Sequence, residues 1–286
     1  MDFLRRTPAF LAFLSFFFAP VSFAGIPTLS FQDLSDQDIT PQGKSALSLN
    51  QENWRHAETP HFVYHFTDEK QAETIYLHAE VQYQWIKDMF GVEKDTWKKK
   101  GHIFIFEDKQ VWEKFNTRGG EKFLGFAGFT DGWELFMQRA PYWLSPQRTL
   151  AHEITHIILF RFLDGPIPLC LNEGFAEFMA TKAVAVQAGG NEYNIRTLQL
   201  IPKDEYISLR ELTQARSYPS NIQAFYQESE LLARFLILNY GSKNFYSVLK
   251  RASQGEDFEK VLDGVYDVDL PELEEKFKTY AIQPSA

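Results

Sequence analysis

Two histidines and a glutamate in the stretch AHEITHIILF are the first group of side chains in this sequence that can do chemistry. His152 and His156 are four residues apart, and Glu153 directly follows the first histidine. On a helix this spacing places both imidazoles on one face, where they can bind one metal ion at about 2.0–2.1 Å from each nitrogen. The carboxylate of Glu153 then lies beside the remaining coordination position, which is the arrangement of a zinc hydrolase.

A catalytic zinc ion takes three protein ligands and one water molecule, so the site needs a third donor. The stretch PLCLNEGFAEF offers Glu173 and, one helical turn later, Glu177. We expect Glu173 to be the third ligand and Glu177 to accept the free ring N–H of a ligand histidine. The swapped assignment of the two glutamates stays open. Cys170 is a competing soft ligand, but it precedes the helix that directs Glu173, and we expect it to be a small buried hydrophobic residue.

The helix that must carry the two histidines has clear boundaries. Ser145 can serve as its N-cap, Pro146 suits the first helical position, and Gly165-Pro166 ends the pattern. We therefore predict a helix over about 146–163. The chain then reverses through the Gly and Pro residues, and the stretch that starts at LNEGFAEF predicts a second helix, which brings Glu173 back toward the first.

The remaining elements divide the chain into two different halves. HFVYHF alternates like a strand, the following DEKQAETIYLHAEVQYQWIKDMFG has helical spacing, and HIFIF at 102–106 predicts another strand. A short helix follows, and then a hairpin over 123–138 that turns at Asp131-Gly132. Further helices are predicted at about 222–240, 242–253, 255–265 and 270–280.

These patterns predict an α+β fold, with a small mixed sheet and helices in the N-terminal half and an all-helical C-terminal half. We divide the chain into a signal peptide (1–24), an extended lead-in (25–54), an α+β subdomain with a hairpin edge (55–145) and a helical subdomain that carries the zinc site (146–286).

The stretches HEITH and LNEGFAEF together carry a family resemblance. The sequence resembles the gluzincin superfamily of zinc metallopeptidases, which includes thermolysin and the zinc aminopeptidases, and more closely its bacterial peptidase MA-like branch, over roughly residues 55–280. The resemblance implies a thermolysin-like architecture, with His152, His156 and Glu173 as ligands of Zn2+ and Glu153 as general base. Glu177 matches the acidic position that supports a ligand.

A third stretch, FYQESELLARFLILNYG, resembles the helix of zinc aminopeptidases that carries a tyrosine which stabilises the transition state. That position is Tyr226, but the Lys-Gly that those enzymes have shortly after it is Glu228-Ser229 here, so the role of Tyr226 stays open. We find no counterpart of their amine-binding Gly-Ala-Met-Glu-Asn segment, and do not expect aminopeptidase activity of that type. The hairpin at 123–138 matches the sheet edge that binds extended peptide in this superfamily; the alternative is an internal pair of strands.

Our leading hypothesis is a secreted zinc metallopeptidase that hydrolyses peptide bonds. Zinc polarises the scissile carbonyl and lowers the pKa of its water molecule, Glu153 takes the proton and passes it to the leaving amine, and Tyr226 donates to the oxyanion. The expected partner is a peptide or protein substrate, and the oligomeric state is open. The alternative is a non-catalytic, zinc-containing binding module of the cell envelope.

Composition and the N-terminus limit the possible partners, disulfides and cellular location of the protein. A formal net charge of −9 disfavours nucleic acid as a partner, and a single cysteine excludes an intrachain disulfide. Arg5 and Arg6, the apolar stretch after them, and the small residues Ser22 and Ala24 predict a secretory signal that is cleaved after Ala24, with no stable membrane insertion afterwards. This predicts a secreted and, in a Gram-negative bacterium, periplasmic protein. The alternative is an uncleaved anchor helix.

The other five histidines and one run of lysines have no partner in the sequence pattern. We expect the histidines to be ordinary surface or interface residues, and the lysines to form a solvated turn. The histidines are His56, His61, His65, His78 and His102, and the lysines are Lys98, Lys99 and Lys100.

Overall fold

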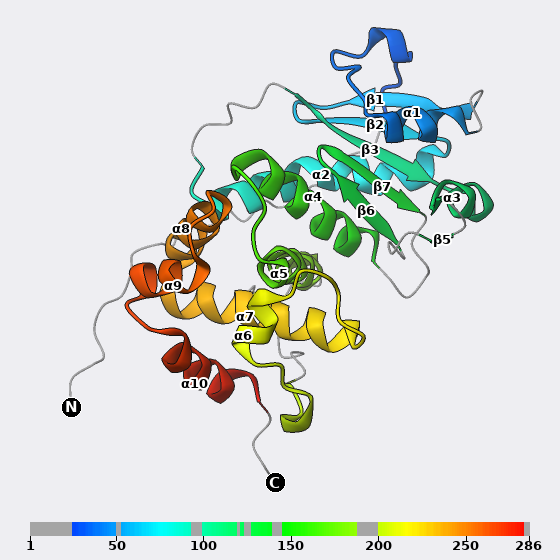
Figure 1. Ribbon diagram of the computed structural model, residues 1–286. Coiled ribbons are helices and arrows are strands. Elements are labelled where there is room, and N and C mark those ends of the chain that lie inside the picture. Colours follow the sequence, from blue (N-terminus) through cyan, green and yellow to red (C-terminus); the bar gives the residue numbers. More distant parts are fainter. Residues whose placement is uncertain are drawn as a thin grey trace.

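The computed structural model describes residues 25–49, 53–92, 99–118, 121–122, 127–138, 145–187 and 200–282. It confirms the α+β class, because a small mixed sheet occupies the N-terminal half and helices make up most of the C-terminal half (Figure 1). Within these ranges, no helix has the length and apolar character needed to cross a membrane.

The main sheet has five strands among the described residues, in the spatial order β1-β2-β3-β7-β6. Strand β2 is parallel to β3, and β3 to β7, whereas β1 and β6 are antiparallel to their neighbours. The strands are β1 (Arg55–Glu58), β2 (Phe62–Phe66), β3 (Gly101–Phe106), β6 (Gly128–Asp131) and β7 (Glu134–Gln138). A separate two-stranded sheet pairs β4 (Thr117–Arg118) with β5 (Glu121–Lys122).

The hairpin predicted at 123–138 is present as β6 and β7, although residues 123–126 lie outside the described part of the chain. Its turn contains Gly132 at a φ of +64°, a left-handed conformation that glycine adopts without steric cost. Strand β6 has one neighbour, β7, among the strands that the structure describes, and therefore forms an edge of the sheet.

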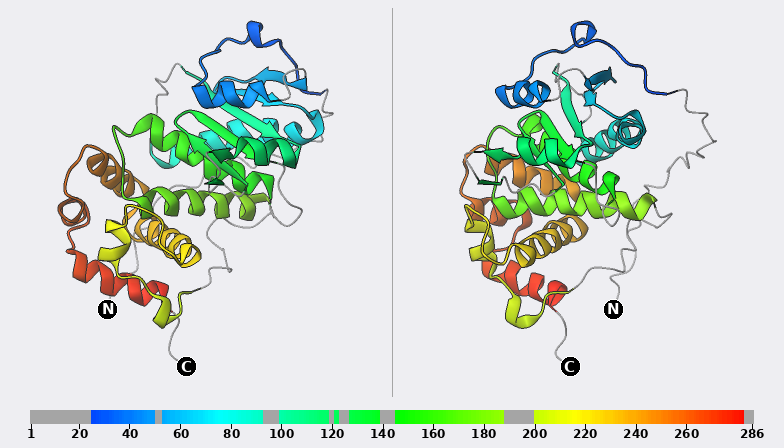
Figure 2. Two further views of the ribbon diagram at one scale, coloured as in Figure 1. Left: turned by 45° about the vertical axis from the view of Figure 1, so that its right-hand side comes forward. Right: turned by 90° about the vertical axis from the view of Figure 1, so that its right-hand side faces the viewer.

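Helices cover both faces of this sheet (Figures 1 and 2). Because side chains alternate along a strand, Tyr64, Ile103 and Leu135 point to one face. There they pack in a core with α2 (Glu69–Met89) and α4 (Pro146–Phe162). Phe104, Phe106 and Phe136 point to the other face. They form a second core with α1 (Pro41–Ser48) and α3 (Lys109–Phe115), so β2 and β3 are buried throughout.

The predicted lead-in contains a helix. Helix α1 begins after Thr40, whose side chain caps it by accepting from the N–H groups of Gln42 and Gly43, and Pro41 occupies the first helical position. Farther upstream, Ile26 is buried, and its N–H donates to Glu69 Oε1 at 3.0 Å. The hydrogen bond from Ile26 therefore attaches the start of this segment to α2.

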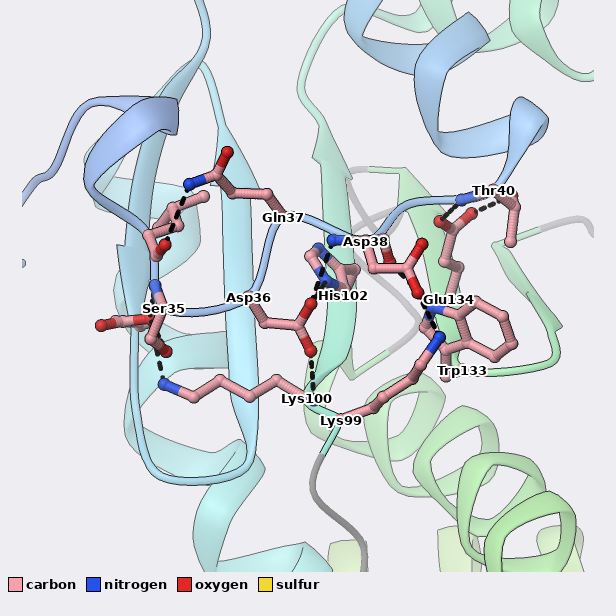
Figure 3. Close-up of polar contacts among 12 residues, drawn as sticks. Ser35, Asp36, Gln37, Asp38, Thr40, Lys99, Lys100, His102, Trp133 and Glu134 are labelled. Carbon is pink, nitrogen blue, oxygen red and sulfur yellow. Dashed lines mark hydrogen bonds and ion pairs between the residues drawn. The ribbon is translucent and has the colours of Figure 1, made fainter.

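We call residues 35–40, which run across the sheet ahead of α1, the strap (Figure 3). The carboxylate of Glu134 accepts hydrogen bonds from the N–H and the hydroxyl of Thr40, both at 2.6 Å. The indole N–H of Trp133 donates to the carbonyl of Asp38 at 3.2 Å. The strap is thus tied to the turn and first residue of β7.

The lysine run also holds the strap, instead of forming only a solvated turn. The backbone N–H of Lys100 donates to Asp36 Oδ2 at 2.8 Å, and its ammonium lies 3.0 Å from Glu58 Oε2. Lys99 forms an ion pair with Asp38, and its ammonium lies 4.3 Å from the centre of a ring of Trp133. Lys98 lies outside the described residues.

Three of the five histidines that we predicted to be ordinary surface or interface residues lie in the interior. His56, His65 and His102 stand in a row across β1, β2 and β3, with exposures of 7%, 0% and 0%. Nδ1 of His56 lies 2.8 Å from Nδ1 of His65, whose Nε2 lies 3.0 Å from Nδ1 of His102. The carboxylate of Asp36 in the strap follows, 3.8 Å from His102 Nε2. The prediction was wrong because these partners come from neighbouring strands, which the local pattern does not reveal.

The C-terminal half packs as layers of helices beneath α4. Helix α5 contacts α4 on one side and α7 on the other (Figure 1). A Cβ atom at Gly174 of α5 would lie 2.0 Å from the carbonyl oxygen of Ser229 in α7, so glycine allows this close approach. The helices are α5 (Leu169–Gln187), α6 (Leu209–Gln214), α7 (Ile222–Tyr240), α8 (Ser242–Ser253), α9 (Phe258–Tyr266) and α10 (Leu270–Ala281), with 3-10 turns at Phe31–Asp33 and Lys203–Glu205.

Candidate metal centre

Helix α4 places the two motif histidines side by side. It spans Pro146–Phe162, which confirms the helix predicted over 146–163. Its apolar residues, among them Ile154, Ile157 and Ile158, are buried against the sheet and α5, and this fixes the opposite stripe toward the cleft. As a result, the Nε2 atoms of His152 and His156 lie only 3.1 Å apart.

Helix α5 brings a carboxylate to the same point. Oε2 of Glu173 lies 3.5 Å from Nε2 of His152 and 3.7 Å from Nε2 of His156. One donor atom from each of the three residues lies within 4.8 Å of the other two, so the three side chains can hold one metal ion. This is the combination of two histidines and one glutamate found in catalytic zinc sites.

The other ring nitrogens determine which histidine atoms are free to bind a cation. Nδ1 of His156 lies 3.2 Å from the side-chain oxygen of Asn172, and Nδ1 of His152 lies 3.0 Å from Oε1 of Glu177. With a metal bound, a proton on each Nδ1 would face these oxygens and leave both Nε2 atoms free to bind the cation. Two ring nitrogens and a carboxylate this close together need a shared positive charge, which a proton or a metal ion can supply. The residues present therefore fit a divalent metal such as zinc.

The charges around the site also favour a cation. Burial lowers the pKa of His152, but contacts with Glu173 and Glu177 outweigh it and raise this pKa to about 10. For Glu173, burial raises the pKa, whereas the neighbouring His152 and His156 lower it to a net value of about 2. In the metal-free protein a proton on His152 thus balances the carboxylates. Arg148 pairs with Glu177 and holds it beside His152.

Glu153 lies beside this cluster and is held by the edge strand. Its side chain is only 6% exposed, and its Oε2 accepts a hydrogen bond from the hydroxyl of Thr130 in β6 at 2.7 Å. The same hydroxyl also lies 3.2 Å from the carbonyl oxygen of Glu153. The edge strand and the carboxylate expected to act as base are therefore directly connected.

Tyr226 and a second tyrosine complete the site. Tyr226 lies in the second turn of α7, with its ring centre 6.5 Å from that of His152. The hydroxyl of Tyr218, a residue that our sequence reasoning missed, donates to Glu173 Oε1 at 2.7 Å. The two tyrosine rings stack with centres 5.8 Å apart and an interplanar angle of 19°. Burial raises the pKa of both hydroxyls, so both remain protonated donors.

Cys170 is not part of the ligand cluster. It is fully buried at the start of α5, and burial raises the pKa of its thiol to about 12. A thiol that stays protonated is a poor metal ligand. This agrees with its predicted role as a small hydrophobic residue.

The His152, His156 and Glu173 cluster, Glu153 and the two tyrosines open into one cleft of about 1510 Å³. Strand β6 forms part of one wall through Gly128, Phe129 and Thr130, and the two tyrosines contribute to the lining from the helical half. Much of the remaining lining is apolar, although Asp164 and Arg216 also contribute to it. The residues of this apolar end are Leu159, Phe160, Leu163, Ile167 and Ile222, of which Phe160 is 49% exposed.

Comparison with known families agrees with this arrangement. The family model of the Peptidase MA superfamily matches residues 103–283, which is more than half of the chain and includes the histidines, Glu173 and both tyrosines. A search of curated proteins finds no match. The chain therefore belongs to the Peptidase MA superfamily and has a metallopeptidase-like fold.

Proposed function

We propose that this protein is a zinc-dependent peptidase that hydrolyses peptide bonds in extended peptide or protein substrates. One observation carries the proposal: the Nε2 atoms of His152 and His156 face each other at 3.1 Å, with Glu173 Oε2 within 3.7 Å of both. A carboxylate that is not needed to hold the metal, Glu153, stands next to this cluster in the cleft. That combination suits hydrolysis better than a purely structural metal clip.

The residues take separate roles in this mechanism. When bound, zinc polarises the scissile carbonyl and lowers the pKa of a water molecule. Glu153 takes the proton of that water and passes it to the leaving amine, while the Thr130 hydrogen bond fixes Oε2 and with it the direction of the carboxylate. The hydroxyl of Tyr226, which stays protonated, donates to the developing oxyanion.

Substrate binding involves the edge strand. An extended peptide that adds to the outer edge of β6 gains main-chain hydrogen bonds with little demand on its sequence. Because Thr130 of β6 is bonded to Glu153, such a peptide passes directly beside the base. We further propose cleavage of the signal peptide after Ala24 and a secreted, periplasmic location for the mature chain.

The test uses mature protein, residues 25–286, and two variants. Elemental analysis is expected to give about one zinc ion per chain in the wild type and a large loss in His156→Ala. Glu153→Gln is expected to keep the zinc ion but to lose hydrolysis of a peptide library, since a neutral amide cannot act as the base. Zinc binding without hydrolysis in the wild type would favour the non-catalytic binding module. Hydrolysis that survives in Glu153→Gln would remove Glu153 from its assigned role.

A further inference from the structure

We infer that Tyr218 is a positioning residue that fixes Glu173 as a single-oxygen ligand and holds Tyr226 in place. This inference rests on the proposed function, because it concerns how the zinc ligands of that site are oriented. Tyr218 lies between α6 and α7, on neither of the two helices that carry the ligands.

The two oxygens of Glu173 face different partners. Oε2 faces the Nε2 atoms of both histidines, whereas Oε1 accepts the hydroxyl of Tyr218 at 2.7 Å. Glu173 is only 4% exposed, so little water is available to replace that hydroxyl. A hydrogen bond to a charged acceptor is roughly twice as strong as one between neutral groups, which is enough to choose between two orientations of a carboxylate. Tyr218 therefore leaves Oε2 as the donor atom of Glu173.

Stacking connects this residue to the second tyrosine. The rings of Tyr218 and Tyr226 are nearly parallel, and Tyr218 also contacts Phe225 edge-on at 6.1 Å between ring centres. Phe225 is buried in the first turns of α7. Tyr218 thus lies between the ligand on α5 and the oxyanion donor on α7, and one side chain orients both.

The variant Tyr218→Phe removes the hydroxyl and keeps the ring. Without its donor, Oε1 can turn toward the metal position, so Glu173 can change from one ligand atom to two, and Oε2 loses the partner that orients it for binding. We expect the dissociation constant for zinc, measured by competition with a chelator, to rise about 10-fold, the lower end of the effect of losing such a partner. In the cobalt-substituted protein we expect weaker visible absorption bands, because a fourfold site becomes more highly coordinated.

Tyr246→Phe is the matched control. Tyr246 packs on Phe90 away from the cleft, so removing its hydroxyl leaves the surroundings of Glu173 unchanged. Loss of the buried hydrogen bond to Glu173 is expected to lower the melting temperature of the metal-free Tyr218→Phe protein. Zinc affinity is therefore compared at a temperature where both metal-free proteins are fully folded, which separates positioning from general stability. Unchanged zinc affinity and an unchanged cobalt spectrum in Tyr218→Phe would overturn the inference and leave the peptidase proposal intact. A wild type that binds no zinc would overturn both.

Discussion

The hydroxyl of Thr130 donates to Oε2 of Glu153 at 2.7 Å, and this bond joins the edge strand β6 to helix α4. The two residues are 23 positions apart in the chain, yet they lie in one hydrogen-bonded unit. Under the proposed function, a peptide that binds along β6 would approach Glu153 in a direction that the same strand sets.

Replacing Thr130 by valine keeps the shape of the side chain but removes the donor. We expect kcat/KM for peptide hydrolysis to fall about 10-fold, because the carboxylate of Glu153 loses a hydrogen bond worth about 1.5–3 kcal/mol. The zinc content should not change. Thr130→Ser is the matched control, since it retains the hydroxyl and should keep most of the activity. Equal rates in the valine and serine variants would show that the bond plays no part in hydrolysis.

The apolar end of the cleft predicts a preference for substrates with a bulky apolar side chain near the scissile bond. Phe160, at 49% exposure, is one turn of α4 beyond His156 and lines this end. Burying a large apolar side chain contributes about 1.5–3 kcal/mol, so Phe160→Ser should lower kcat/KM for such peptides about 10-fold. Peptides with small polar residues at the same place serve as internal controls. A uniform loss across both peptide sets would argue against a role in specificity.

The close contact of α5 and α7 predicts that Gly174→Ala is strongly destabilising. The added methyl group would lie 2.0 Å from the backbone oxygen of Ser229, so one helix must shift. We expect the free energy of unfolding in urea to fall by about 2 kcal/mol or more, as for other overpacked cores. The matched control is Gly264→Ala in α9, where the nearest atom is the flexible end of Arg251 at 3.2 Å. Equal stability of the two variants would contradict the packing argument.

The buried histidine row predicts that stability falls in mild acid. Burial lowers the pKa of His56 to about 4 and that of His65 well below 6.5. An unfolded histidine binds a proton near pH 6.5, so between pH 6.5 and 4 the unfolded chain binds more protons than the folded one, and the folded state loses stability as the pH falls. For His56 alone we expect a loss of about 2 kcal/mol over this range.

The measurement is urea unfolding at several pH values, with wild type compared with His56→Gln. Glu228 and Glu230 act in the opposite direction, because burial raises their pKa values to about 8 and about 7, so only the difference between the two proteins isolates His56. Asp36, Glu134 and Lys100 also face the row or its neighbours, and they are unchanged in the variant. The same pH dependence in both proteins would exclude His56 as a source of acid sensitivity.

Local spacing made part of the site predictable. His152 and His156 share a helix. Residues four positions apart on a helix lie on the same face, and this holds in any fold. Tyr218 has no such signal. It stands in a loop, SYPSN, and only the packing of α7 on α5 brings its hydroxyl to Glu173.

The fold shows the same division between local and long-range information. Helix and strand periods predicted the α+β class and most elements. The surroundings of His65 and His102 depend on which residues pair across neighbouring strands. The local sequence pattern does not reveal that pairing. On α2 the helical period is clear, but Leu77 and Val81 are 48% and 42% exposed whereas Tyr83 and Ile86 face the core.

Finally, the contact between Ile26 and Glu69 gives the proposed removal of the signal peptide a physical effect on the folded chain. Cutting after Ala24 turns the nitrogen of Gly25 into a positively charged amine, one residue before the N–H that already donates to Glu69 Oε1 at 3.0 Å. A side-chain atom at Gly25 would lie 2.8 Å from that same oxygen, so the new charge arises close to a carboxylate. The mature chain would then carry a positive charge near the Glu69 carboxylate that the precursor does not have.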